Sequence, residues 1–363
     1  MQSTKSSESF HSKCCLSRCT ILTIGDPHFK VNNAIEMDRF VEKMLTFLDE
    51  TLKHETIHAI VLLGDILHDH EDIDLLALTR ATKFIFELKK RTKVYLLIGN
   101  HDRRNNGIYC TDEHPFLGLM ETEGVTVIHK PTIDTISGLN FFFIPYVEPG
   151  RFFEALETIP EWKLCRAGFA HQEFYGAKMG HKRSEIGDKY DLEFPLVISG
   201  HIHDYDNLQE NIVYVGTPIQ HSFGDTDDKT ISIFMFTNDS IDHKRIDLKL
   251  PKKRIITIRS DEELKEYVLT PLDAGLVKVI LRGDDAEVKA MMKSHIVKLW
   301  KSYNINIAKK TERKHIVKEK KKDETKERKT EKFNITLFRV LKEPELIELF
   351  EEINKSTILH SKK

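Results

Sequence analysis

The sequence predicts an α/β fold of two packed sheets with helices on their outer faces, and two observations lead to this prediction. Between residues 20 and 102, short apolar runs rich in strand formers alternate with segments whose apolar residues recur at near-helical spacing. That alternation is typical of βαβ units around a largely parallel sheet. After residue 122 the chain becomes a series of short strands, so a β-rich second half follows an α/β first half.

In the first half, strands are expected at short apolar runs with β-branched or aromatic members, over residues 20–24, 57–63 and 94–98. Helices are expected where the apolar residues recur with helical spacing, over residues 35–54 and 72–90. In the second half, a helix over residues 113–122 precedes strands at residues 125–129, 139–147, 165–170, 196–199, 212–215 and 231–236. The last three strands are spaced closely, as in antiparallel hairpins.

The composition is typical of a globular protein, with 40% hydrophobic and 31% charged residues in a chain of 363. The net charge of -2 gives no global signature of nucleic-acid binding, so any basic surface must be local. No apolar run approaches the roughly 18 residues of a membrane span, and the N-terminus lacks the apolar core of a signal peptide. A soluble, intracellular protein is therefore expected, and the odd number of cysteines, 5, favours reduced thiols.

Changes of composition along the chain predict five regions. Residues 1–19 are polar and Ser-rich and are expected to be disordered; a zinc site at Cys14, Cys15, Cys19 and His11 is the less favoured alternative. A catalytic domain is expected over residues 20–250. A small strand-helix-strand-helix-strand module is expected over residues 251–308, with its elements at residues 254–258, 262–268, 276–281, 286–301 and 305–308. A charged flexible linker over residues 309–332 then leads to a pair of short amphipathic helices over residues 333–363.

Polar residues suited to metal binding or proton transfer follow five of the expected strands. The segments are Gly25-Asp26-Pro27-His28, Gly64-Asp65-Ile66-Leu67-His68, Gly99-Asn100-His101-Asp102, His171 and Gly200-His201-Ile202-His203. In open α/β sheets, ligands bind at the C-terminal ends of the strands. Independent polar turn residues are the structural alternative, because Asp and Asn are common after strands. The ordered recurrence of five such segments argues against that alternative.

The residue types at these places favour a two-metal site. Carboxylate, imidazole and amide oxygen together suit Mn²⁺, Fe²⁺ or Zn²⁺ and exclude a thiolate site. The candidates outnumber the ligands of one ion, whereas two ions about 3.5–4 Å apart with a bridging carboxylate would use them well. Such a pair lowers the pKa of a bridging water and clamps phosphate oxygens for in-line displacement. The candidates are Asp26, His28, Asp65, His68, Asn100, His101, His171, His201 and His203.

These ordered motifs resemble those of the calcineurin-like metallophosphoesterase superfamily over roughly residues 20–237. The resemblance implies a four-layer α/β/β/α sandwich of two mixed sheets. It also implies that Asp26, His28, Asp65 and His203 hold one ion, and that Asp65, Asn100, His171 and His201 hold the other, with Asp65 bridging. His101 would contact the phosphate and assist the leaving group as an acid.

Within the superfamily, the second motif lacks the Arg of protein phosphatases and is similar to that of SbcD-type DNA repair nucleases, including phage recombination endonuclease subunits. There, a His three residues after the bridging Asp positions the DNA phosphate, and His68 matches it. The segment Tyr214-Val215-Gly216-Thr217-Pro218, the module over residues 251–308 and the terminal helix pair also resemble that branch. The resemblance implies a Mn²⁺-dependent exo- or endonuclease, with Fe²⁺, Zn²⁺ and Mg²⁺ as alternative metals, that binds DNA and a coiled-coil ABC-type ATPase through residues 333–363, with homodimerisation as a further expectation.

Two other functions stay open from the sequence. A small-molecule phosphodiesterase or phosphatase of the same superfamily would work without residues 254–363. A non-catalytic scaffold on the same fold would be expected to have lost metal ligands, whereas every ligand position here is filled.

Overall fold

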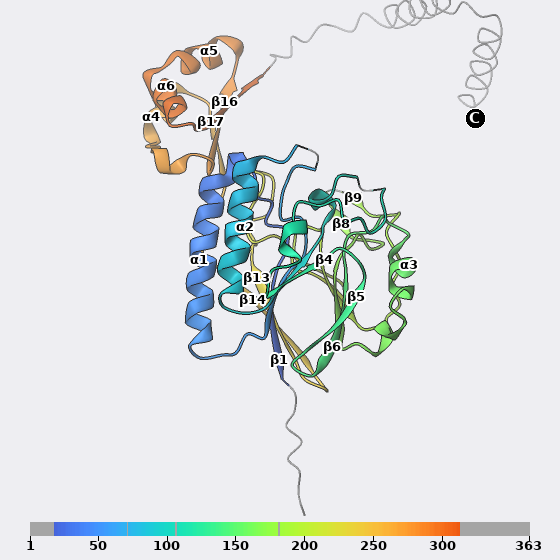
Figure 1. The fold of residues 1–363 in the computed structure, drawn as a ribbon. Helices are drawn as coiled ribbons and strands as arrows, with labels where there is room; N and C mark the ends of the chain where they lie inside the picture. The colour runs from blue at the N-terminus through green and yellow to red at the C-terminus, as the bar shows by residue number, and fades with distance from the viewer. Residues whose placement is uncertain (1–17, 71, 106, 181, 313–363) are drawn as a thin grey trace, which may run out of the picture. The chain divides into compact units, whose positions relative to one another are not determined.

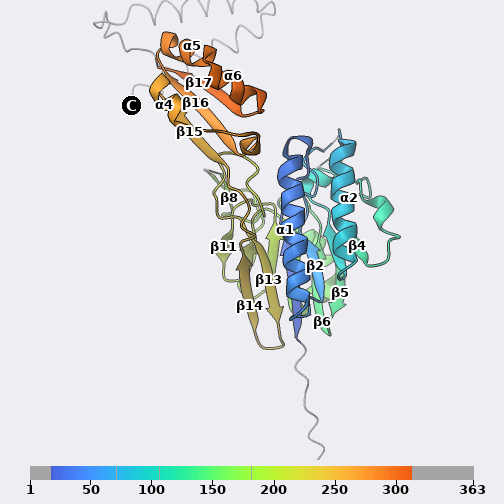
Figure 2. The ribbon, with the colours of Figure 1, turned by 90° about the vertical axis from the view of Figure 1, so that its left-hand side faces the viewer.

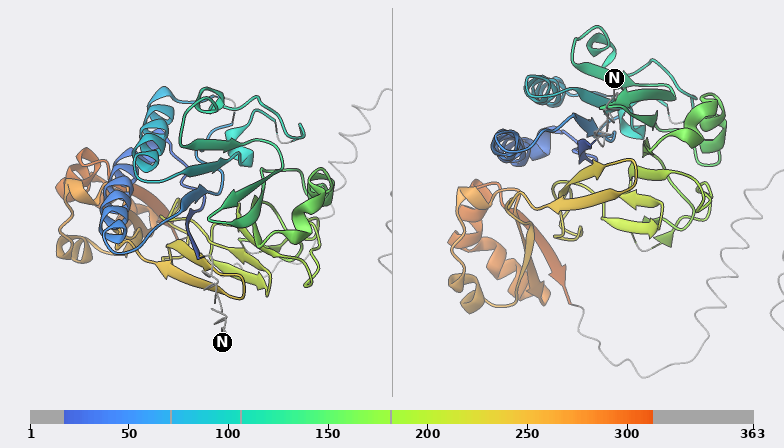
Figure 3. Two further views of the ribbon diagram at one scale, coloured as in Figure 1. Left: turned by 60° about the horizontal axis from the view of Figure 1, so that its bottom comes forward. Right: turned by 90° about the horizontal axis from the view of Figure 1, so that it is seen from below.

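Two six-stranded mixed sheets pack face to face in the computed structural model, which describes residues 18–70, 72–105, 107–180 and 182–312. The first sheet has the order β14 (Ile241–Ile246), β13 (Ile231–Phe236), β1 (Cys19–Ile24), β2 (Ala59–Leu62), β3 (Val94–Leu97), β4 (Val125–Ile128). The second has the order β11 (Asp206–Gln209), β12 (Ile212–Tyr214), β10 (Leu196–Gly200), β7 (Ala167–His171), β6 (Leu139–Ile144), β5 (Thr132–Ile136). Figures 1 and 3 show helices outside both sheets, which confirms the predicted four-layer sandwich.

The centre of each sheet is parallel. Strands β1, β2, β3 and β4 pair in parallel in the first sheet, and β6, β7, β10 and β12 do so in the second. Parallel strands end at the same edge of a sheet, so the loops that follow β1, β2 and β3 meet those that follow β7 and β10. The fold thereby gathers the five motif segments at one place.

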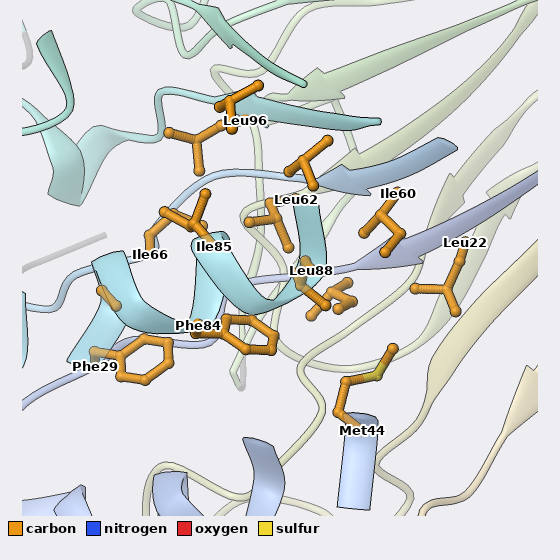
Figure 4. Close-up of a cluster of buried hydrophobic side chains, with 14 of the residues drawn as sticks. Leu22, Phe29, Met44, Ile60, Leu62, Ile66, Phe84, Ile85, Leu88 and Leu96 are labelled. Atoms are coloured by element: carbon orange, nitrogen blue, oxygen red, sulfur yellow. The ribbon is translucent and has the colours of Figure 1, made fainter. Parts of the chain in front are cut away.

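Helices α1 (Ala34–Leu52) and α2 (Leu75–Lys89) cover the first sheet (Figure 2). Asp74 caps α2, because its side chain accepts hydrogen bonds from the N–H groups of Leu76 and Ala77. On the inner face of α2 the Phe84 ring lies 5.8 Å from that of Phe29 and 5.6 Å from that of Phe40, centroid to centroid (Figure 4). This aromatic cluster packs the two helices against the sheet.

The space between the sheets is filled mainly by aromatic and branched side chains. Tyr95 of β3 stacks on Phe143 of β6 with the ring centroids 4.6 Å apart. Gly168 in β7 is required by packing, because a Cβ there would lie 1.9 Å from the Phe142 ring. The short helix α3 (Phe152–Glu157) packs on the outer face of the second sheet, where Phe152 and Trp162 belong to one buried cluster.

Several expectations about single elements are wrong. Strands β10 and β12 pair in parallel, and β13 crosses to the first sheet beside β1, so the three strands form no hairpins with one another. The spacing of apolar residues indicates where strands are, but it does not indicate which strands pair. Strand β11, which comes between β10 and β12 in the sequence and lies at the edge of the sheet, is polar and was therefore not predicted. The expected helix over residues 113–122 is reduced to one 3₁₀ turn, Leu117–Leu119, because Pro115 and Gly118 disfavour a longer helix.

A smaller parallel sheet follows, with the strands β15 (Arg254–Ile258), β16 (Val277–Gly283) and β17 (Asn306–Thr311). It has its own buried core and the helices α4 (Asp261–Glu266), α5 (Asp285–Lys293) and α6 (His295–Ser302). The single helix expected over residues 286–301 is divided at Ser294, whose extended backbone and side chain cap α6.

Parts of the predicted regions lie outside the described residues. These are residues 1–17 of the N-terminal extension, the linker from residue 313 onward and the helix pair over residues 333–363. Two predicted bounds are wrong: Cys19, expected in the disordered extension, is the first residue of β1, and residues 309–311, expected in the flexible linker, form the end of β17. Among the helices that the structure describes, none has the length and apolar content needed to cross a membrane.

We expect the Phe84→Ala variant to lower the free energy of unfolding by about 3–5 kcal/mol, since it removes a fully buried ring from the helix–sheet core. Urea unfolding followed by circular dichroism measures this. The control is Leu75→Ala in the same helix. The Leu75 side chain is 76% exposed, so its removal should lower the free energy of unfolding by no more than about 0.5 kcal/mol. Equal effects of the two variants would contradict this packing.

Candidate active site

All nine candidate residues gather at the C-terminal edge of the two sheets. Asp26 and His28 follow β1, Asp65 and His68 follow β2, and Asn100 and His101 follow β3, whereas His171 ends β7 and His201 and His203 follow β10. A chain of contacts, none longer than 4.0 Å, joins every one of them into one cluster. The segments come from both sheets, so the cluster forms only when the sandwich is assembled.

Four of these residues have backbones in the left-handed region. The φ angles are 37° for Asp26, 49° for His28, 49° for Asp65 and 80° for His201. Such conformations are unfavourable for residues with a Cβ, by about 1–3 kcal/mol each, and they concentrate at functional sites. Their occurrence together at four candidate ligands indicates that the fold positions these side chains at the expense of backbone energy.

Two glycines make room for the side chains of the cluster. A Cβ on Gly64, which has a φ of +100°, would lie 2.5 Å from Nδ1 of His171. A Cβ on Gly99 would lie 2.2 Å from Oδ1 of Asp65. The glycines that begin the second and third motif segments are therefore needed for the close approach of Asp65 and His171.

One group of donor atoms forms around His171 and Asn100. The ring of His171 is oriented by a contact of 2.7 Å between Nδ1 and the carbonyl oxygen of Leu63. Its Nε2 lies 3.0 Å from Oδ1 of Asn100 and 3.3 Å from Oδ1 of Asp65. Nδ1 of His201 lies 2.9 Å from the same amide oxygen. Two nitrogens and two oxygens thus converge on one small volume.

A second group forms around His28. Its Nδ1 lies 3.2 Å from the carbonyl oxygen of Leu67, which leaves Nε2 to face the cluster. That Nε2 lies 3.1 Å from Nε2 of His203 and 3.6 Å from Oδ2 of Asp65. The carboxylate of Asp26 lies within 4.8 Å of the ligand atoms of His28 and Asp65, and it accepts hydrogen bonds from the N–H of His201.

These two groups fit a pair of divalent cations. The donors are imidazole nitrogens, carboxylates and an amide oxygen, with no sulfur, which suits borderline or hard divalent metals. Both His28 and His171 contact a backbone carbonyl through Nδ1, the arrangement that fixes the orientation of metal-binding histidines. Asp65 turns one oxygen to each group and has the geometry of a bridging ligand.

The electrostatics of the cluster agree with cation binding. Burial lowers the pKa of His203 to about 4 and that of His28 well below its usual value, so both rings are neutral at pH 7 and can act as ligands. Burial disfavours the charged form of His171, but Asp65 and Asp26 outweigh it and raise its pKa to about 9. A cation bound at Nε2 would displace that proton, so metal binding is expected to release protons.

His68 and His101 lie beside the second donor group, and a ring nitrogen of each lies within 4.8 Å of a ring nitrogen of His28. Nδ1 of His68 lies 3.4 Å from Nδ1 of His28, and the His101 ring lies parallel to the His68 ring at 5.5 Å between centroids. Nδ1 of His101 contacts the carbonyl oxygen of His68, so its Nε2 faces the cluster, 4.0 Å from Oδ2 of Asp65. Both rings are only partly buried and accessible to a substrate.

Three residues that support the cluster are not among the nine candidates. The buried Asp102 accepts the N–H groups of Ile66, Leu67 and Gly99, and so ties the second motif to the third. Nε2 of His221 donates to the carbonyl oxygen of Asp26 at 2.9 Å. Glu173 lies 3.8 Å from Nε2 of His201. Asp102 closes the third motif and was within reach of pattern reasoning, whereas His221 and Glu173 occur outside every motif.

The chain belongs to the calcineurin-like phosphoesterase family, whose model matches residues 19–205. It is therefore a hydrolase of phosphoesters of the kind that uses divalent metals. Two viral relatives are similar over a longer stretch, 78% of this chain in each case. Protein 244L of Invertebrate iridescent virus 6 is 40% identical over its whole length, and protein 078R of Invertebrate iridescent virus 3 is 38% identical over 81% of its length. Both carry the provisional name phosphoesterase, which states no substrate.

We expect the full chain to bind two divalent ions, and the Asp65→Asn variant to lose more than roughly 100-fold in metal affinity because both donor groups lose an anionic ligand. Isothermal titration with Mn²⁺, checked by elemental analysis, measures this. Asp134→Asn is the matched control. Asp134 lies on the edge strand β5, and its carboxylate accepts hydrogen bonds from Lys93 and Tyr95. Unchanged stoichiometry and affinity in Asp65→Asn would refute the bridging role.

Proposed function

We propose that the chain is a DNA nuclease of the SbcD type, which hydrolyses phosphodiester bonds in DNA repair or recombination. The observation that carries this proposal is the position of His68. Its ring lies parallel to His101 and beside His28, where it can contact a phosphate held at the donor groups. A His three residues after the bridging Asp is the feature that distinguishes the nuclease branch in the sequence.

The roles of the ligand residues follow from the two donor groups. We assign Asp26, His28, Asp65 and His203 to one ion and Asp65, Asn100, His171 and His201 to the other, with Mn²⁺ as the proposed metal. When bound, such ions lower the pKa of water and stabilise negative charge on phosphate oxygens.

His68 and His101 would act on the substrate directly. His68 would donate a hydrogen bond to a phosphate oxygen, and this bond strengthens as charge accumulates in the transition state. His101 holds Nδ1 on the carbonyl oxygen of His68, so its Nε2 would deliver a proton to the leaving 3′-oxygen. Burial lowers the pKa of both rings in the free chain. A bound phosphate would raise these pKa values, because an anion stabilises the imidazolium form.

Two separate clefts next to the donors support a polymeric substrate. One cleft of about 540 Å³ is lined by Asp65, His101 and His203, and another of about 850 Å³ is lined by His68 and His221. A small ester needs only the space at the donors themselves. A polynucleotide extends on both sides of the bond that is cut.

The remaining regions are assigned roles by resemblance to the same nucleases. The sheet over residues 254–311 would cap the DNA. The part of the Lys-rich stretch that follows β17, up to residue 332, would act as a tether, and residues 333–363 would bind a coiled-coil ABC-type ATPase. Residues 313–363 lie outside the described part of the chain.

We expect the full chain with Mn²⁺ to degrade linear double-stranded DNA, and His68→Ala to lower the rate by roughly 100-fold or more, because a phosphate contact is lost at the reacting centre. Release of labelled nucleotides from an end-labelled duplex measures this. His54→Ala, at an exposed turn position just after α1, is the control. Hydrolysis of bis(4-nitrophenyl) phosphate without any cleavage of DNA would contradict the nuclease proposal and favour a small-molecule phosphodiesterase function.

We expect affinity purification of the full chain from its native host to recover a large ATPase with coiled-coil arms. A chain truncated after residue 332 should recover none, because the proposed binding helices are missing. Mass spectrometry of the two eluates makes the comparison. Recovery of the same ATPase with both chains would contradict the role given to residues 333–363.

A further inference from the structure

The cleft of about 850 Å³ beside the donor groups is lined by a lysine and a phenylalanine that the proposed chemistry does not use. Lys30 and Phe223 both line it, together with His68 and His221 from the edge of the cluster. Lys30 comes two residues after His28, and Phe223 two residues after His221. A positive charge and an aromatic ring therefore face the same space next to the site.

Lys30 is held in place by its backbone. The preceding residue, Phe29, is buried in the helix-side core and donates its N–H to the carbonyl oxygen of Ile66 at 2.7 Å. The N–H of Lys30 donates to Oδ1 of Asn33 at 3.1 Å, and Nδ2 of Asn33 donates to the carbonyl oxygen of His28 at 2.9 Å. The buried Asn33 side chain thus fixes the turn that presents Lys30 to the cleft.

The ammonium group of Lys30 forms no ion pair within 4.0 Å with a carboxylate of the described residues, and Glu36, Asp69 and Asp225 attract its charge only from farther away. Two of the three carboxylates that line the cleft are already engaged. Both carboxylate oxygens of Glu36 accept a hydrogen bond from Nζ of Lys253 at 2.7 Å, and Asp74 caps helix α2. The third, Asp69, is exposed. A partly buried cation without a close ion pair is stabilised further by an incoming anion.

Phe223 stands on a loop that is tied to the metal-binding edge. Oδ2 of Asp225 accepts the N–H groups of His221 and Ser222, and the His221 ring donates to the carbonyl oxygen of Asp26. The ring of Phe223 is only partly buried, although Nζ of Lys253 lies 5.4 Å from its centroid. A partly exposed aromatic ring in a polar cleft can stack with a nucleobase.

We propose that this cleft is a nucleotide subsite next to the scissile bond, in which Lys30 pairs with the adjacent phosphate and Phe223 stacks on its base. This inference rests on the proposed nuclease function, because it takes a polynucleotide as the substrate. Neither contact reads a base edge, so the subsite binds a strand without regard to sequence.

The direct test is binding of a fluorescein-labelled oligothymidylate to the full chain, measured by anisotropy over a series of salt concentrations. We expect Phe223→Leu to bind roughly ten-fold more weakly, and Phe223→Tyr to bind as the unaltered chain does, because only the ring is needed. We expect Lys30→Met to lower the slope of log Kd against log salt by about 0.7, the value for one phosphate contact on a single strand. Lys30→Arg should keep the slope. Lys53→Met, which removes a lysine paired with Glu50 at the far end of α1, is the charge control.

Kinetics with two substrates separate this subsite from damage to the metal centre. For Lys30→Met and Phe223→Leu, kcat/KM for the oligonucleotide should fall about ten-fold further than kcat/KM for bis(4-nitrophenyl) phosphate. If the unaltered chain cleaves DNA and both variants bind the oligonucleotide as tightly as it does, the subsite is refuted and the nuclease function stands. If the unaltered chain neither binds nor cleaves DNA, both proposals fail. Equal losses on both substrates would assign these residues to the metal centre and overturn the subsite.

Discussion

The carboxylate of Asp65 is the point on which the site depends. Its two oxygens face two separate groups of donors, one around His171 and one around His28. Its backbone is left-handed, and the N–H of His101 donates to Oδ1. A side chain held this firmly between two converging sets of nitrogen and oxygen atoms can join two cations that would otherwise repel one another.

The two packed sheets bring the loops around Asp65 together. Parallel pairing places the ends of β1, β2 and β3 at one edge of the first sheet, and the ends of β7 and β10 at the matching edge of the second. The core between the sheets, with Tyr95 stacked on Phe143, fixes the distance between these edges. Packing between aromatic side chains in the core therefore helps to set the distances among the candidate ligands.

Much of this arrangement was accessible from the sequence, because strand-end motifs combine a short apolar run with residues of distinct chemistry. Asp26, Asp65, Asn100 and His171 were predicted to meet, and they do. The pairing of β10 with β12 was not, since apolar spacing carries no information on which strand lies next to which. His221 and Phe223 were not predicted as site residues for a related reason. They lie near the site because their loop folds back on Asp26, and no local sequence pattern indicates this contact.

The central claim is that one carboxylate joins two metal ions, and a crystal structure of the full chain grown with Mn²⁺ tests it most directly. An anomalous difference map is expected to show two peaks about 3.5–4 Å apart, one on the His28 side of Asp65 and the other on the His171 side. A single peak, or a second one remote from Asp65, would contradict the account.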